Sequence, residues 1–278
     1  NMKYVEMAGL VKFDFLGLRT LSEVYNCLER IHQDENIELK LDDIPFDDEK
    51  TYAMLSKGLV AGLFQLETSP GMKRVIIQIQ PDKFEDFIPI PALYRPGPLD
   101  SGMMDSFIRR KIGLEPVTYM HPLLEKSLSE SYGVCIYQEQ LMQIAQDMAG
   151  FTLGEADLLR YAVGKKDAEM LNNMKEKFIT GSIGNGVERE KAIEIFEYLE
   201  PFARYAFNKS HTVAYAILSY QMAFLKTHYP RQFMAAMMTG ESAYSDKIMK
   251  YIAECAKLAD FLGTEIKVLP PDINRSDT

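Results

Sequence analysis

The chain has 278 residues, of which 47% are hydrophobic, and its 31 basic against 40 acidic side chains give a formal charge of −9. This much apolar material supports a hydrophobic core and excludes a disordered or low-complexity protein. At roughly 150 residues per domain, the length indicates one large domain or two modest ones. The chain begins with Asn1 and no leader-like segment follows, so we expect a piece of a longer protein.

An extended segment is predicted at the front of the chain. In residues 9–18 the apolar side chains Val11, Phe13 and Phe15 alternate with polar ones, which is the pattern of a strand. The spacing then changes to three and four over residues 21–31, which predicts an amphipathic helix. The sequence therefore predicts an incoming strand followed at once by helical structure.

Three further segments precede the main helical region. Residues 52–57 have a helical pattern, and residues 68–70 form a typical helix start with a hydroxyl cap and a proline in the first turn. The proline-dense residues 89–98 cannot form a regular helix, because X-Pro steps favour extended backbone, and we predict a structured loop there.

From residue 101 onward one helix follows another, with glycines and prolines between them. The predicted helices cover residues 101–112, 121–130, 136–149, 154–163, 167–181, 187–203, 209–228, 230–239 and 244–262. Residues 265–269, before two prolines, are predicted to be a short strand that leads out. The fold class is therefore mainly α, with a short β segment at the N-terminus.

Composition and motifs exclude several classes of protein. The longest apolar stretch, residues 213–225, is shorter than the roughly 20 residues that a membrane helix needs. The three cysteines are far apart and lack metal-ligand spacing. No HExxH, P-loop or dinucleotide-binding glycine motif occurs. We expect a cytoplasmic protein without a membrane helix, a disulfide framework or a zinc site.

Lys12 and Asp14 lie on one face of the predicted N-terminal strand, roughly 7 Å apart. A carboxylate and an amine so placed are suited to holding a divalent cation beside an anionic substrate. The pattern alone favours the alternative that both are solvent-facing residues of an edge strand. One carboxylate is also too few, since Mg²⁺ takes several oxygen ligands.

The pI of about 5.1 counts against nucleic-acid binding when taken alone, because phosphate contacts need Lys and Arg. The acids, however, are concentrated at the front of the chain, where residues 1–60 hold 12 acids and 7 bases. The bases occur in clusters, and we predict that five of them contact DNA. These are Lys73, Arg74, Arg109, Arg110 and Lys111.

Two other polar groups are candidates for binding an anion. Arg160, Lys165 and Lys166 lie at the end of one predicted helix, where they either project together from a corner or complement the helix dipole. Asn208, Lys209, Ser210 and His211 precede a long helix, where they are either ordinary caps or a site for a phosphate or a sugar hydroxyl.

Several stretches, in the same order along essentially the whole chain, resemble the C-family of bacterial replicative DNA polymerases, the alpha subunits of DNA polymerase III. The matching stretches are GLVKFDFLGLRTL (9–21), GLFQLETSPGM (62–72), ALYRPGPLDSGM (92–103), YGVCIYQEQLMQIAQDMAGF (132–151), GEADLLRYAVGKK (154–166), FNKSHTVAYAILSYQMAFLKTHYP (207–230) and VLPPDIN (268–274). The resemblance implies three parts: residues 1–20 as the end of the palm, 21–240 as the fingers, and 241–278 as the start of a helical clamp-binding region.

The resemblance also implies roles for single residues. Asp14 is similar to the third of three catalytic aspartates that bind two Mg²⁺ ions, while the family's paired-aspartate motif lies upstream and no Asp-x-Asp occurs in this chain. Tyr161 stands where the family commonly has a second arginine. The residues that match the family's incoming-nucleotide site are Lys12, Arg95, Arg160, Lys165, Lys166, Asn208, Lys209, Ser210 and His211.

The function that the resemblance implies is template-directed DNA synthesis in bacterial chromosome replication. The implied partners are primer–template DNA, dNTPs and, through regions mostly outside this chain, the sliding clamp, proofreading and clamp-loader subunits. The fragment alone is expected to be inactive. An error-prone member of the same family used in repair synthesis, and a non-catalytic helical interaction module, remain alternatives.

Overall fold

The computed structural model describes residues 2–5, 8–11, 13, 15, 17–165, 168–203, 205–270 and 272–274, and their regular structure is helical. The α-helices are α1 (Met2–Val5), α2 (Arg19–Glu35), α3 (Glu49–Ser56), α4 (Pro70–Ile79), α5 (Phe84–Phe87), α6 (Ile90–Leu93), α7 (Pro96–Asp100), α8 (Met103–Lys111), α9 (Glu125–Leu128), α10 (Gln138–Ala149), α11 (Leu153–Lys165), α12 (Ala168–Gly184), α13 (Arg189–Ala203), α14 (Lys209–His228), α15 (Pro230–Gly240) and α16 (Ser245–Leu262). Short 3₁₀ turns, η1 (Leu41–Asp43), η2 (Pro122–Leu124) and η3 (Ser129–Ser131), complete them.

The predicted mainly-α fold is confirmed, and several helix ends agree closely. The helix predicted over residues 209–228 is α14, and Ser69 caps α4 by accepting a hydrogen bond from the Met72 amide at 3.2 Å, with Pro70 in its first turn. The helix predicted over 121–130 is instead divided into η2, α9 and η3.

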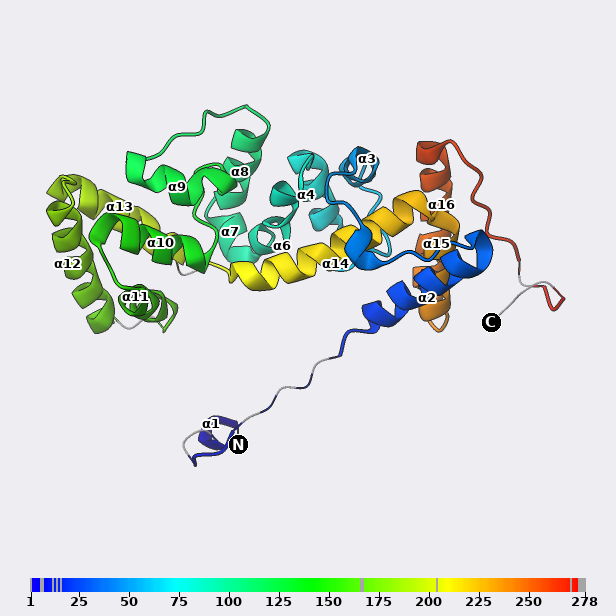
Figure 1. Cartoon of the computed structure of the whole chain (residues 1–278), viewed down its shortest axis with the longest axis horizontal. Helices are drawn as coiled ribbons and strands as arrows, with labels where there is room; N and C mark the ends of the chain where they lie inside the picture. Colours follow the sequence, from blue (N-terminus) through cyan, green and yellow to red (C-terminus); the bar gives the residue numbers. More distant parts are fainter. Residues whose placement is uncertain are drawn as a thin grey trace.

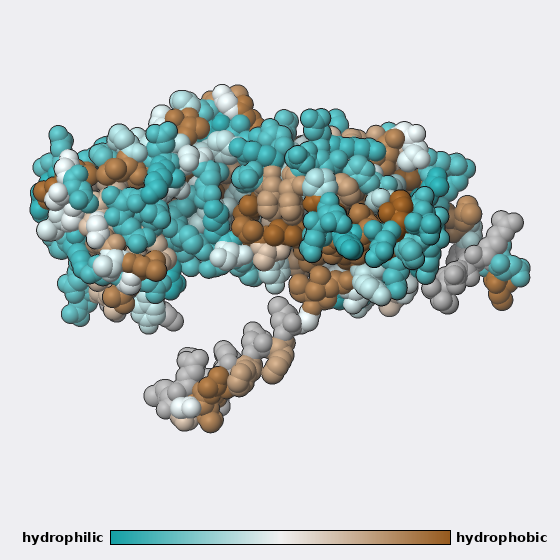
Figure 2. Space-filling model, in the orientation of Figure 1, coloured by the Kyte–Doolittle hydropathy of each residue, from teal (hydrophilic) through white to brown (hydrophobic). Residues whose placement is uncertain are grey.

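The two predicted strands are wrong for the residues that the structure describes. Within 9–18 and 265–270, none of those residues lies in a strand. A strand needs a neighbour to accept its backbone hydrogen bonds, and no ladder partner faces either described segment. The apolar side chains Val11, Phe13 and Phe15 are instead 73%, 75% and 93% exposed, on a segment that extends away from the body (Figure 2).

The proline-dense segment is also different from the predicted loop, because it contains the two short helices α6 and α7. Pro91 and Pro96 lie in the first turns of these helices, where the backbone has no need of an N–H donor. The rule that the residue before proline is extended does hold at Arg95, with φ −141° and ψ 156°. Each proline therefore begins a helix here rather than preventing one.

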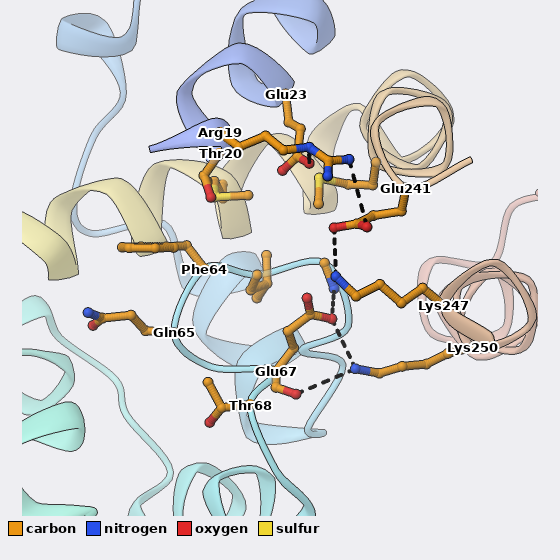
Figure 3. Close-up of a pocket in the computed structure, with 14 residues that line it drawn as sticks. Arg19, Thr20, Glu23, Phe64, Gln65, Glu67, Thr68, Glu241, Lys247 and Lys250 are labelled. Carbon is orange, nitrogen blue, oxygen red and sulfur yellow. Dashed lines mark hydrogen bonds and ion pairs between the residues drawn. The ribbon is translucent and has the colours of Figure 1, made fainter. Parts of the chain in front are cut away.

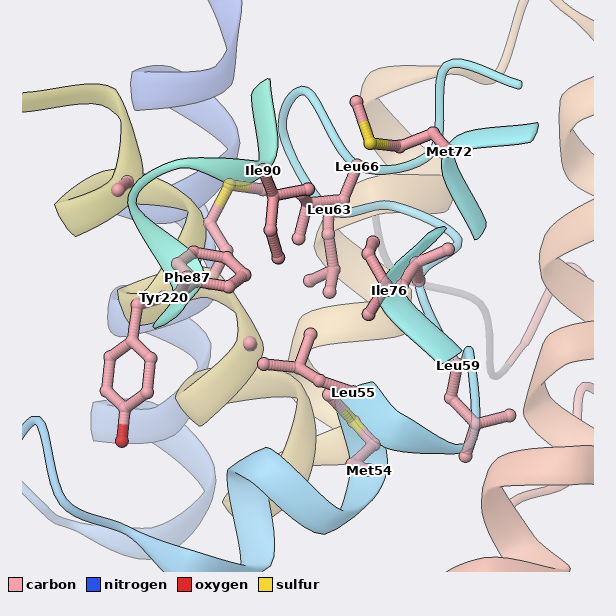
Figure 4. Packing of buried hydrophobic residues seen from close by; sticks show 14 of the residues in the cluster. Met54, Leu55, Leu59, Leu63, Leu66, Met72, Ile76, Phe87, Ile90 and Tyr220 are labelled. Atoms are coloured by element: carbon pink, nitrogen blue, oxygen red, sulfur yellow. The ribbon is translucent and has the colours of Figure 1, made fainter. Parts of the chain in front are cut away.

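Two hydrophobic cores lie along the long axis of the molecule (Figure 1). The larger is formed by α2 to α6 and α8 with α14, α15 and α16, and the smaller by α9 to α13. In the larger core, Leu55, Leu63 and Ile76 are fully buried and approach one another from α3, the following loop and α4 (Figure 4). Burying each such side chain contributes about 1.5–3 kcal/mol. The loop after α3 is therefore part of the packed core, together with α3 and α4.

The extended residues 134–137 run between the two cores. Val134 and Ile136 belong to the larger core and Cys135, between them, to the smaller one. This is the alternation expected of an extended chain, whose successive side chains point to opposite sides. The same segment forms a parallel bridge with Phe207, in which the Phe207 amide donates to the Ile136 carbonyl at 2.9 Å. Four residues therefore link both cores to the start of α14.

A buried ion pair anchors the other end of α14. The Lys226 ammonium is fully buried and donates to Glu254 Oε1 of α16 at 2.7 Å and to the carbonyls of Leu59 and Ala61 at 2.9 and 2.7 Å. Burial lowers the pKa of Lys226, although the adjacent Glu254 carboxylate opposes this shift. These three acceptors match the three N–H donors of the buried ammonium. The ion pair and its hydrogen bonds join α14, α16 and the loop after α3.

The Asp48 carboxylate caps α3 and gives a testable dependence of stability on pH. It accepts from the Thr51 amide at 2.8 Å and lies 2.9 Å from His228 Nε2. Burial alone would raise its pKa, but the hydrogen bonds from Thr51 and His228 outweigh burial, and the pKa is lowered. Because its pKa is lowered in the folded chain, the ionised Asp48 carboxylate stabilises the fold at pH values above the ordinary carboxyl pKa of about 3.9. This stabilisation is lost as the pH falls through the lowered pKa of the folded chain.

We therefore expect Asp48→Asn, which keeps the cap, to reduce the free energy of unfolding by about 1 kcal/mol at neutral pH. The difference from the unmodified chain should shrink below about pH 4, where the Asp48 carboxyl takes up its proton. Urea unfolding at a series of pH values measures it. A difference that grows towards acid pH would show that Asp48 is not the group responsible.

Among the described residues, no helix combines the length and apolar character needed to cross a membrane. Cys27, Cys135 and Cys255 are buried as free thiols, and burial raises the pKa of Cys27 and Cys135 to about 12. Such thiols are unreactive and serve as core residues.

Candidate nucleotide-binding site

Residues 208–211 form the start of α14, and the sequence there is that of a capped helix. Asn208 is extended, with φ −70° and ψ 118°, and its side-chain oxygen accepts from the His211 amide at 2.8 Å. Asn208, Ser210 and His211 are exposed. The helix start therefore presents polar side chains and the positive end of a 20-residue helix dipole to solvent.

Arg95 is brought to this helix start from a segment more than 100 residues earlier. Its guanidinium donates to the Tyr205 carbonyl at 2.6 Å and to the Ala92 carbonyl at 2.8 Å, and it lies 4.5 Å from the centre of the Phe207 ring. Burial lowers its pKa, but a guanidinium stays charged. Two predicted site segments, Arg95 and residues 208–211, thus form one cluster.

Gly97 makes this approach possible. A Cβ atom at Gly97 would lie 2.1 Å from Tyr205 Cδ1, which is far inside van der Waals contact. Without a side chain at that position, the Tyr205 ring rests against the backbone of α7. The proline-dense segment is therefore held directly against the residues that lead into α14.

A row of aromatic rings runs from the helix start along α14. The ring of His211 lies 5.4 Å from Phe207 and 4.3 Å from Tyr215, and Tyr215 lies 5.3 Å from Phe64 in a stacked arrangement. The row consists of partly exposed or exposed rings, which are surfaces suited to stacking on a planar group. It connects the helix start to the loop that contains Phe64.

Lys209 is engaged with acidic side chains. Its ammonium is 2.5 Å from Glu130 Oε2, and its backbone amide donates to both carboxylate oxygens of Glu139, at 3.0 and 2.9 Å. The ammonium also lies 5.7 Å from the centre of the Tyr137 ring. Lys209 therefore ties α14 to α10 and to the turn before it, and its charge is partly neutralised.

Two of the other cationic candidates, Arg160 and Lys165, lie on α11. Arg160 pairs with Asp157 at 2.7 Å and is about one-third exposed. The backbone of Lys165 ends α11, while its side chain and Lys166 lie outside the described residues. Helix α11 packs against α10, whose first residue, Gln138, donates its backbone N–H to the Phe207 carbonyl at 3.0 Å. Helix α10 therefore lies between Arg160 on α11 and the cluster at the start of α14.

Lys12 and Asp14, the candidates from the N-terminal segment, both lie outside the described residues. The predictions for them therefore remain predictions. Among the residues that are described, no group of three or more His, Cys, Asp or Glu side chains is arranged to hold a metal ion. A magnesium site that includes Asp14 would need its further ligands from elsewhere.

Most of the predicted DNA-binding side chains at the end of α8 form ion pairs with acidic side chains of this chain. Arg110 pairs with Glu115 at 2.9 Å, and Lys111 pairs with Asp82 and the buried Asp86, both at 2.9 Å. Arg109 is 61% exposed, with a longer contact of 3.6 Å to Glu115. On α4, Lys73 is half-buried and Arg74 is exposed. Among the α8 bases, Arg109 is the one that is well exposed to an external phosphate.

A cavity of about 570 Å³ that the sequence reasoning did not identify lies beyond the ring row, between α2, the loop 62–68 and α16. One wall carries two groups of ion pairs: Glu241 pairs with both Arg19 and Lys247, and Glu67 pairs with Lys250 (Figure 3). Phe64 and Gln65 form another part of the wall (Figure 3). In the sequence, the stretch GLFQLE (62–67) stood out only as part of the resemblance. Its single charged residue does not predict the ion pairs that line the cavity.

Burial of Glu23 beside this cavity raises its pKa, although Arg19 opposes the shift. The side-chain oxygen of Gln65 is buried without a hydrogen-bond partner among the described residues, and its backbone is left-handed at φ 61°. Positive φ is strained for a residue other than glycine and is typical of functional sites.

Comparison with known proteins identifies the family. A family model described as the bacterial DNA polymerase III alpha subunit finger domain matches residues 20–186. DNA polymerase III subunit alpha of Aquifex aeolicus is 47% identical over 277 residues, covering 100% of this chain, and that of Escherichia coli (strain K12) is 48% identical over 279 residues, covering 97%. The Pasteurella multocida protein of the same name is 49% identical over 279 residues. This chain spans 23–24% of the length of these relatives. The chain therefore belongs to the bacterial DNA polymerase III alpha subunit finger-domain family.

Proposed function

We propose that this chain forms the nucleotide-binding part of a template-directed DNA polymerase, which transfers a nucleotide from a dNTP to a primer 3′-hydroxyl during bacterial chromosome replication. The observation that carries the proposal is the cluster in which Arg95 and residues 208–211 meet at the start of α14. A guanidinium, a helix N-terminus and exposed rings suit the phosphates, the sugar and the base of one nucleotide. The relatives named above are DNA polymerase III alpha subunits, which supports the same proposal.

In this proposal each group has its own task. Ser210 at the α14 N-terminus, between the amides of Lys209 and His211 that already bind Glu139 and Asn208, orients the sugar and phosphates, and His211 presents its ring and its nitrogen atoms to the sugar or base. Arg160 and Lys165 on α11, together with Lys166, which follows them in the sequence, neutralise the triphosphate. Such positioning and charge stabilisation are the main contribution of a protein to phosphoryl transfer. Lys12 is proposed as a further nucleotide contact.

The metal part of the proposal assigns Asp14 as one ligand of two Mg²⁺ ions. Magnesium ions, when bound, stabilise the charge on the attacking and leaving oxygens of such a transfer. Because the described residues contain no complete ligand set, the remaining carboxylates are proposed to come from the part of the family's sequence that precedes this chain.

We further propose three parts, with the palm ending near residue 20, the fingers over 21–240, and a clamp-binding region that begins at 241. Primer–template DNA would contact Lys73, Arg74, Arg109, Arg110 and Lys111. The sliding clamp, proofreading and clamp-loader subunits are proposed as partners through other regions of a cytoplasmic replicase. The isolated chain, with one metal carboxylate, is expected to be inactive.

The proposal is tested at His211 in a polymerase that contains this chain. His211→Phe keeps a ring against Tyr215 but removes the nitrogen atoms, and we expect the KM for dNTP to rise roughly tenfold, as for one lost hydrogen bond of about 1.4 kcal/mol. The Kd for primer–template should stay unchanged. His32→Phe, at an exposed position on α2, is the matched control. An unchanged KM in His211→Phe, or an equal rise in His32→Phe, would refute the assignment.

A further inference from the structure

A second cavity, of about 400 Å³, lies on the other side of the loop that carries Glu67 and Thr68, between the start of α4 and the outer face of α16. Three lysines line it: Lys73 from α4, and Lys250 and Lys257 from α16. Glu67 and Lys250 line both cavities and are labelled in Figure 3. The cavity contains none of the residues assigned to nucleotide binding.

The charge of this cavity is positive in a chain with a formal charge of −9. Of its two acids, Glu254 is buried and paired with Lys226, and Glu67 pairs with Lys250 at 2.9 Å. Lys73 and Lys257 form no ion pair or side-chain hydrogen bond with any described residue. Two ammonium groups therefore remain available to an external anion.

Lys73 is held in place, while Lys250 and Lys257 are exposed on α16. The Lys73 stem lies directly over Gly58, since a Cβ atom at Gly58 would be 2.7 Å from Lys73 Cε. Lys250 and Lys257 are seven residues apart on α16, two helical turns, so they share one face about 10 Å apart. A stem that is already confined loses less entropy when its ammonium binds a ligand.

We propose that the cavity formed by Lys73, Lys250 and Lys257 binds the phosphodiester backbone of a DNA strand. Lysines on helix positions about 10 Å apart can reach two phosphates of one strand, whereas a single pyrophosphate, whose two phosphorus atoms share one oxygen, is too compact to contact both. The inference rests on the proposed function for the identity of the ligand, DNA, and it extends the DNA contacts from α4 to α16.

The test measures binding of a short fluorescein-labelled DNA duplex to the chain by anisotropy, between about 50 mM and 200 mM salt. Each phosphate contact contributes a slope of about −0.9 to log K against log salt. For Lys73→Gln/Lys257→Gln, which removes the two available ammonium groups, we expect at least a roughly tenfold loss of affinity at the lowest salt and a slope reduced by about 1.8. Lys73→Gln should reduce the slope by about 0.9.

Lys40→Gln is the matched control, because Lys40 is exposed and lies outside the cavity. Equal affinity and equal slope in the double variant and in Lys40→Gln would overturn the proposal, as would the absence of DNA binding by the unmodified chain. Displacement of DNA by inorganic pyrophosphate at constant ionic strength would instead assign the site to a free diphosphate. Because His211→Phe reports on nucleotide KM and the lysine variants on DNA affinity, either assignment can fail alone.

Discussion

Lys226→Ala should lower the free energy of unfolding of the chain by about 3–5 kcal/mol, because it leaves the buried Glu254 carboxylate without its partner. The same change removes the donor to the carbonyls of Leu59 and Ala61, so the loop after α3 loses its attachment to α14. Denaturant unfolding followed by circular dichroism measures the loss. A loss below about 1 kcal/mol would show that water reaches Glu254 in the folded chain.

Two further variants separate charge burial from packing. Lys226→Met with Glu254→Leu removes both charges and keeps much of the volume, so this double variant should be more stable than Lys226→Ala. Lys191→Ala, which breaks the exposed pair with Glu194, is the surface control, and its effect should be about 0–1 kcal/mol. If the double variant is as unstable as Lys226→Ala, packing and not the unpaired carboxylate is responsible.

Asp14→Asn, in a polymerase that contains this chain, should reduce kcat at least about 10³-fold, because a metal ligand that stabilises charge in the transition state contributes several kcal/mol. The KM for dNTP and the Kd for primer–template should change little, since the change removes one charge and keeps the size of the side chain. Single-turnover primer extension measures the chemical step separately from binding.

The matched control is Asp42→Asn, at an exposed carboxylate in η1. Full activity in Asp14→Asn would contradict the catalytic assignment. A parallel loss in both variants would show that the assay reports net charge and not metal binding. A raised KM with normal kcat would place Asp14 among the nucleotide contacts instead.

Local structure followed from the sequence where a short-range cause was sufficient. Ser69 and Pro70 begin α4 as predicted, because a hydroxyl cap and a first-turn proline act within one turn. The proline segment was predicted less well, since its prolines fell at helix starts, and nothing in the local pattern distinguishes that position from a loop. The strand at residues 9–18 was predicted from alternation alone, but alternation does not supply a neighbouring strand.

The site was predictable as a set of residue types and segments, but not as an arrangement. The polar helix start at Asn208 was visible in the sequence, whereas the contact between Arg95 and the Tyr205 carbonyl joins residues 110 positions apart. Only tertiary packing, including the space left by Gly97, decides that pairing. Likewise, the bases of α8 form a basic cluster in the sequence. In the folded chain, however, Arg110 pairs with Glu115, and Lys111 pairs with Asp82 and Asp86.

The extended residues 134–136, whose side chains alternate between the two cores, have a mechanical consequence. Because Val134 and Ile136 are held by one core and Cys135 by the other, neither core can rotate against the other without twisting these residues. The twist passes through the hydrogen bond between Ile136 and Phe207 to the first turn of α14. Rotation of one core against the other would therefore displace Phe207 and the start of α14, and under the proposed function a nucleotide bound there would oppose that rotation.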